Sequence, residues 1–216
     1  MPDVLMLAGA LLVAGPAIGT VCLFYPPFWR VWTVPREEHL ALVAAHRLAW
    51  TMANVGFTSA TVLTTAGLVL LAGSLDVADG PSAIVVAGVV AYAIAGSLWC
   101  AGLAIRTRTT PALAALVASG EPTEPVETLV GSVTGGLFAS FMTTTCIALF
   151  VIGATLALSG VVAAPVGWLA VIVPALALAG FLVFDDMPPF VLYIPTLVIG
   201  LRCSWVGHES QEGTWR

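Results

Sequence analysis

Two aspartates close together are the first residues of this chain whose type and spacing suggest chemistry. Asp76 and Asp79 are three positions apart, and Gly80 follows them directly. Carboxylate oxygens are the ligands that Ca²⁺ and Mg²⁺ prefer, so such a pair beside an apolar run suggests a metal site at a membrane surface. Each divalent ion needs several oxygens, however, and Asp-Gly-Pro is a turn sequence. We therefore predict a water-facing turn and no metal site.

The string D-x-x-D-G-x-x-A that begins at Asp76 resembles the opening of the CDP-alcohol phosphatidyltransferase signature, which belongs to a family of membrane enzymes. That signature continues with an arginine, a glycine and two further aspartates, and the four aspartates together hold the metals and supply the base. Here Ile84 stands at the arginine position, and no aspartate occurs between Gly80 and Asp185. The resemblance stops before the working half of the signature, so we reject that activity for this chain.

The segment VPREEHLALVAAHRLAW, residues 34–50, is the second candidate site. His39 and His46 are seven positions apart, so we expect them on one face of a helix, about 10 Å apart along its axis. One haem cannot be gripped by both, because its axial ligands approach from opposite faces. A quinone or lipid headgroup could dock against His46, Arg47 and Trp50. We favour the simpler interpretation, an amphipathic elbow that lies among lipid headgroups.

Hydroxyl and amide side chains gather in two of the apolar segments. The candidate polar seam consists of Asn54, Thr58, Thr61, Thr143 and Thr144. In a membrane helix, a serine or threonine hydroxyl usually bonds to its own backbone, and we expect this here. The alternative is a seam that lines a path or a ligand cavity between the second and fourth predicted helices.

The composition identifies an integral membrane protein. Of the 216 residues, 59% are hydrophobic and 9% are charged, whereas a soluble domain has about 25% charged residues. The uncharged windows are 4–29, 48–75, 80–105, 128–184 and 187–201. A spanning helix needs about 20 residues, so the fourth window holds two helices and the last is short. We predict an all-α polytopic bundle of six transmembrane helices, five of full length and a short sixth.

The arginines predict the orientation and the organisation of the chain. They gather in residues 30–47, the elbow that leads into the second helix, and in residues 106–128, a loop. Cytoplasmic segments collect arginine, so both should be cytoplasmic and the amino terminus outside. Residues 204–216 form a polar tail of the single domain 1–216. The absence of lysine and the acidic loops suggest the plasma membrane of a prokaryote.

Small residues at four-residue spacing predict tight helix packing. Gly15 and Gly19 form one such pair, and Gly131, Gly135 and Ala139 form a longer stripe. In lipid, helices associate through close packing, which small residues permit. The same stripes could serve self-association.

The predicted spans carry no ionisable residue near their middle. Ion-coupled transport and catalysis within the bilayer need such groups, so both are disfavoured. We predict a multi-pass membrane protein without visible catalytic machinery, either a subunit of a membrane complex or a passive facilitator for a small neutral solute. Its partners are the lipid bilayer and other membrane subunits or further copies of itself, and not nucleic acid. The alternative is a redox-associated subunit that binds quinone or haem near His39 and His46.

Overall fold

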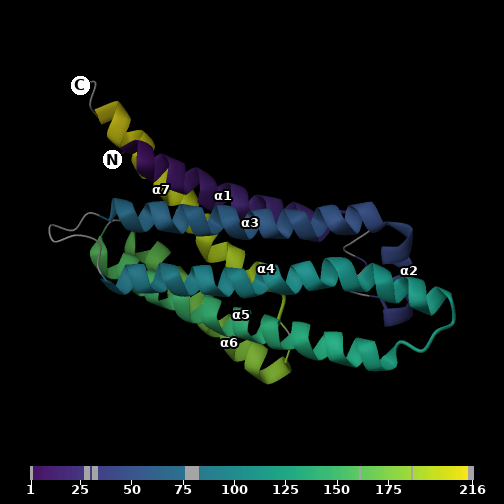
Figure 1. Ribbon diagram of the computed structural model, residues 1–216. Coiled ribbons are helices and arrows are strands. Elements are labelled where there is room, and N and C mark those ends of the chain that lie inside the picture. Colours follow the sequence, from purple (N-terminus) through teal and green to yellow (C-terminus); the bar gives the residue numbers. More distant parts are fainter. Residues whose placement is uncertain are drawn as a thin grey trace.

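The computed structural model is all-helical over the residues that it describes (Figure 1). These are residues 2–26, 30, 34–75, 83–160, 162–185 and 187–213, without the side chains of 2, 36, 37 and 209–213. The helices are α1 (Pro2–Phe24), α2 (Arg36–Ala45), α3 (Arg47–Ser74), α4 (Ala83–Ala118), α5 (Glu124–Ser159), α6 (Ala164–Phe184), the 3-10 helix η2 (Pro189–Leu192) and α7 (Tyr193–Gly213). Asp76 and Asp79, for which we predict a turn, lie outside the described residues.

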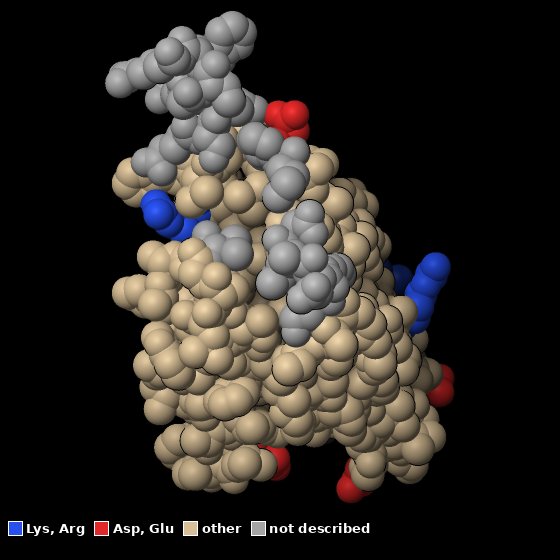
Figure 2. Space-filling model, turned by 90° about the vertical axis from the view of Figure 1, so that its left-hand side faces the viewer, with Lys and Arg blue, Asp and Glu red and all other residues tan. Residues whose placement is uncertain are grey.

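Six helical stretches are long and apolar enough to cross a membrane, which confirms the predicted all-α polytopic bundle. Five are α1, α3, α4, α5 and α6, and the sixth is Pro189–His208. The sixth stretch continues past Arg202, because α7 extends to Gly213. The guanidinium of Arg202 lies 5.3 Å from the centroid of the Trp205 ring. Part of the predicted polar tail is therefore helical. Figure 2 shows a face on which charged side chains are few and isolated among uncharged ones.

The six long helices form a closed ring. In order around it, each packed against the next, they are α3, α1, α7, α6, α5, α4 and again α3. The short helix α2 lies outside the ring against the end of α4 (Figure 1). Helix α4 therefore separates α3 from α5, the two helices that were expected to share the polar seam.

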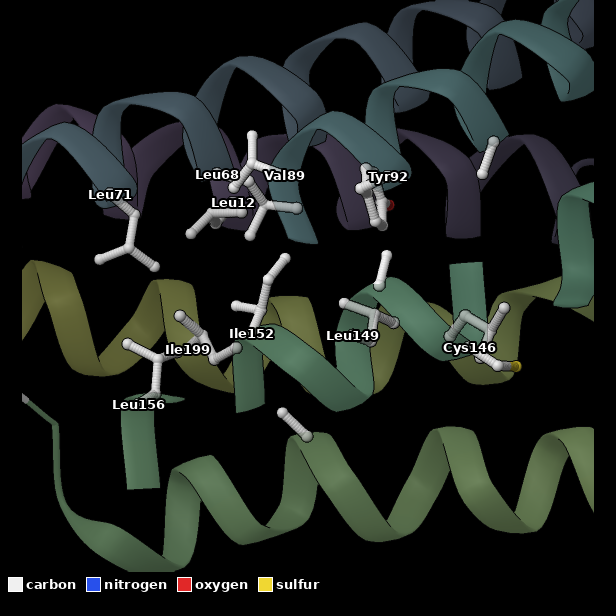
Figure 3. Packing of buried hydrophobic residues seen from close by; sticks show 14 of the residues in the cluster. Leu12, Leu68, Leu71, Val89, Tyr92, Cys146, Leu149, Ile152, Leu156 and Ile199 are labelled. Carbon is white, nitrogen blue, oxygen red and sulfur yellow. The ribbon is translucent and has the colours of Figure 1, made fainter. Parts of the chain in front are cut away.

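One half of the ring is filled with aliphatic side chains. Figure 3 shows them converging from α1, α3, α4, α5 and α7. Fully buried members of this core are Leu12, Leu68, Leu71, Leu149, Ile152, Leu156 and Ile199. Interiors packed to this degree leave few voids larger than a water molecule, so this half of the ring is closed.

Glycines of α1 allow the close helix contacts that their spacing predicts. A Cβ atom on Gly15 would lie 2.7 Å from the carbonyl oxygen of Ala60 in α3, and one on Gly19 would meet the ring of Tyr193 in α7. The expectation is wrong for Gly131 and Gly135 within one chain, because a Cβ on either would meet nothing within 4 Å. Their missing side chains leave space instead of a contact.

Helices α4 and α5 are the longest elements, at 36 residues each. A helix of that length measures about 54 Å, whereas the hydrocarbon layer is about 30 Å thick. Because both helices continue beyond that thickness, most of the loop that we predict at 106–128 is helical. Only residues 119–123 connect α4 to α5. Helix α4 ends at Ala118, and Gly120 follows it with a φ of 74°. The N–H of Glu121 donates to the Leu116 carbonyl oxygen at 3.1 Å. This is the left-handed glycine cap of a helix terminus.

Replacing Gly15 with alanine should loosen the contact between α1 and α3. The added methyl group overpacks against the backbone of Ala60, and overpacking typically costs about 1–3 kcal/mol of unfolding free energy. The measurement is the thermal unfolding midpoint in a mild detergent. The control is Gly73→Ala, since a Cβ at Gly73 meets nothing within 4 Å. Equal midpoints for the two variants would contradict the assignment.

Candidate ligand cavity

The other half of the ring contains a cavity of about 600 Å³. Its walls are the end of α1, the first three turns of α3, the middle of α4, the first half of α5, and residues 187–193 at the break between α6 and α7. Proline stops helices, and Pro188 and Pro189 lie in the break that separates α6 from α7. The chain at this break therefore forms a wall of the cavity instead of filling it.

Aromatic side chains line the deeper part of this cavity. The ring of Trp99 in α4 stacks on Phe141 at 4.9 Å between centroids and lies 5.9 Å from Phe138. Phe138 in turn meets Phe181 of α6 edge-on at 5.9 Å. Trp99 and Phe138 both face the cavity. Offset and edge-to-face pairs are favourable aromatic arrangements, so these rings join α4, α5 and α6 in a fixed wall.

Glycines line the cavity on two of its walls. Gly131 and Gly135 both line it from α5, and neither would bring an added Cβ within 4 Å of any atom. Gly102 lines the opposite wall on α4, where the nearest atom to an added Cβ is the Cβ of Leu137, at 3.8 Å. Helices α4 and α5 can therefore pack against each other and still leave room beside Gly102, Gly131 and Gly135.

A cluster of Trp50, Arg106 and His39 lies at one end of the cavity. Trp50 is only 3% exposed, and its Nε1–H donates to the Arg106 carbonyl oxygen at 3.4 Å. The Arg106 guanidinium lies 5.7 Å from the centroid of the Trp50 ring, within the range of a cation–π contact. The His39 ring meets the same indole edge-on at 5.8 Å. One indole therefore ties α2, α3 and α4 together.

Asn54 is the one member of the predicted seam among the residues that line the cavity. Its side-chain amide donates to the Trp50 carbonyl at 2.8 Å. The Thr58 and Thr61 hydroxyls donate to the carbonyl oxygens four residues earlier, at 3.0 and 2.9 Å, as expected for threonine in a membrane helix. Thr143 and Thr144 lie on α5, beyond α4. The structure does not bring the two halves of the seam together.

A smaller recess of about 360 Å³ adjoins the cavity between α2, α4 and α5. The two spaces share Arg106, Gly131 and Thr134. The remaining polar residues of the recess are His39, Thr110, Glu124, Glu127 and Thr128. The Glu127 carboxylate accepts a hydrogen bond from the Thr123 hydroxyl. Arg106 thus stands at the boundary between an apolar space and a charged one.

The structure separates the two histidines that the sequence placed on one helix face. Helix α2 ends at Ala45, and His46 is an exposed residue at φ −129° and ψ 42° between α2 and α3. That expectation was wrong because packing bends the chain at a place with no glycine or proline. Leu40 packs against α4, and Val43 packs against Trp50. Arg47 is exposed as well, with Nη2 3.4 Å from the Pro111 carbonyl oxygen.

Metal ligands do not gather within the described part of the chain, where no three histidine, cysteine, aspartate or glutamate side chains lie close enough to hold an ion. Comparisons with family models, with curated proteins and with solved structures find no match to this chain. The cavity is therefore the feature that points to a function.

Sequence reasoning missed the role of Arg106 and the cavity glycines. Arg106 follows the uncharged window 80–105, and this position identifies it as a marker of orientation without pointing to a cavity. Gly131 and Gly135 were interpreted as a packing stripe. The available signal was their combination, since two helices that pair along their length can bring an arginine of one helix opposite glycines of the other.

Cysteine labelling should detect the cavity. Cys22 lines it from α1, whereas Cys146 and Cys203 are buried in the closed half. A small membrane-permeant maleimide should modify Cys22 at least tenfold faster than either buried thiol, because closely packed interiors exclude the reagent. Mass spectrometry of peptides gives the rates.

Gly135→Phe should slow the labelling of Cys22 by partly filling the cavity, and the matched control is Gly136→Phe. A Cβ at Gly136 also meets nothing within 4 Å, but this residue does not line the cavity. The cavity assignment is contradicted if the two phenylalanine variants alter the rate at Cys22 equally.

Proposed function

We propose that this multi-pass membrane protein is a non-catalytic subunit that holds a membrane-soluble amphiphile in its cavity. The observation that carries the proposal is an apolar space of about 600 Å³ with a small polar end at Trp50, Asn54 and Arg106. Small-molecule sites typically measure about 300–1,000 Å³ and combine apolar walls with a few polar groups that orient the ligand.

The filled half of the ring favours holding a ligand over passing one. Leu12, Leu71, Leu156 and Ile199 are fully or almost fully buried at the far end of the bundle. An occupant of the cavity would meet this packed core before it reached the other membrane face. A passive facilitator needs a continuous path, and two of the hydroxyl groups predicted to line one, those of Thr58 and Thr61, bond to their own helix instead. The proposal therefore replaces the facilitator with a binding subunit.

A quinone is the second candidate occupant, favoured by the wall of flat rings. Trp99, Phe138 and Phe57 line the cavity, and aromatic faces stack favourably on a planar ring. The polar end could then bind a quinone carbonyl. This differs from the site predicted around His39 and His46, because neither histidine lines the larger cavity. An ultraviolet spectrum of the organic extract, before and after borohydride reduction, identifies a bound quinone.

The ligand should co-purify with the protein in a cavity-dependent way. We expect organic extracts of the purified protein to contain an amphiphile at about one equivalent, and Gly135→Phe to reduce it at least fivefold by occupying the space. Mass spectrometry of the extract measures the ratio of ligand to protein. Gly136→Phe, one position along α5 and outside the cavity lining, should retain it. A ratio that does not differ between the two variants sinks the proposal.

A further inference from the structure

Along the α4–α5 pair, the chemistry of the facing residues changes in a fixed order. Trp99 and Phe138 lie in the apolar cavity, Arg106 and Thr134 line both spaces, and Thr110, Glu124 and Glu127 line the recess. Because the two helices run antiparallel and pack together, residue numbers rise along one wall and fall along the other. Taken over the two walls together, the order is therefore apolar at Trp99 and Phe138, cationic at Arg106 of α4, then anionic at Glu124 and Glu127 of α5.

The level of Arg106 in the membrane matches a lipid headgroup. The part of α4 that precedes it, residues 83–105, is uncharged and long enough to cross the hydrocarbon layer. Arg106 and the indole of Trp50 thus lie where interfacial arginine and tryptophan side chains are usual. The cavity extends from this level toward the middle of the bundle.

We propose that the occupant is a single-chain zwitterionic amphiphile, with a phosphate group next to its chain and an ammonium group beyond the phosphate. The inference rests on the proposed function and names its ligand class. The chain would lie along Trp99 and Phe138, the phosphate beside Arg106, and the ammonium beside Glu124 and Glu127. Arginine binds phosphate through a planar fork of N–H donors.

The two carboxylates explain why the head is zwitterionic and not simply anionic. Glu124 and Glu127 share the recess with Arg106, and His39 lines it from α2. The recess therefore contains two carboxyl side chains and one guanidinium. A bare phosphate would be attracted by Arg106 and repelled by the acids. An ammonium group beyond the phosphate turns that repulsion into attraction.

The test uses four probes that differ by one group at a time. They are 1-myristoyl lysophosphatidylethanolamine, 1-myristoyl lysophosphatidate, monomyristoylglycerol and chain-free glycerophosphoethanolamine. Each is titrated against the full-length protein in a neutral maltoside detergent, and the rise of the unfolding midpoint gives an apparent dissociation constant. We expect the zwitterionic lipid to bind at least tenfold more tightly than each of the other three, because each of them lacks a charge-assisted contact or the apolar chain.

Charge variants should change the preference among the probes and not merely the stability of the protein. Arg106→Gln should bring the zwitterionic lipid to the level of monomyristoylglycerol. The double variant Glu124→Gln and Glu127→Gln should bind lysophosphatidate more tightly than lysophosphatidylethanolamine, which reverses the wild-type order. Arg108→Gln and Glu121→Gln are matched controls, since both residues are exposed and line neither space. Each control should keep the wild-type order.

The outcomes separate this inference from the proposed function. Equal binding of monomyristoylglycerol and the zwitterionic lipid, with both weakened by Gly135→Phe, keeps the ligand cavity and overturns the headgroup. Lysophosphatidate as the tightest ligand of the wild-type protein overturns it too. Equal binding of glycerophosphoethanolamine means that the chain is not recognised, which also overturns it. Binding of every lipid unaffected by Gly135→Phe removes the cavity as the site, and both proposals fail.

Discussion

Helix α1 lies against α3 and α7 through contacts that only glycine permits, and the rest of the bundle depends on them. Gly9 faces the backbone of Gly200 and Ser204, Gly15 faces Ala60, and Gly19 faces the ring of Tyr193. The hydrophobic effect does not drive apolar helices together inside a lipid phase, so close packing has to supply the attraction. With α1 held in this way, Leu12 fills the closed half of the ring and Cys22 reaches the wall of the cavity.

Most of the fold could be predicted from the sequence because its strongest signal is the alternation of uncharged and charged segments. The six spans follow from the need for about 20 apolar residues each. The predictions that failed concern the ends and bends of individual helices. The continuation of α4 through Pro111 and the bend at His46 depend on contacts between distant segments, such as Leu40 with Leu113. A single sequence does not show which segments meet.

The candidate site was less predictable because its character is a matter of juxtaposition. Trp50 and Asn54 were singled out from their types, and both line the cavity. Gly135 was singled out as well, but a G-x-x-x-G spacing has the same form whether the glycines face a neighbouring helix or an empty space. Arg106 becomes part of the candidate site only through its neighbours, an indole on α3 and the recess between α2, α4 and α5.

The tight cap at Gly120 has a mechanical consequence. Because only residues 119–123 connect them, α4 and α5 form a hairpin of two stiff arms that should move as one body. Such a hairpin would pivot about the packed half of the bundle. A push at its tip, from a neighbouring protein or from crowding, would tilt both arms together. It would change the distance from this hairpin to the end of α1 and the start of α3, which form other walls of the cavity, without unfolding any helix.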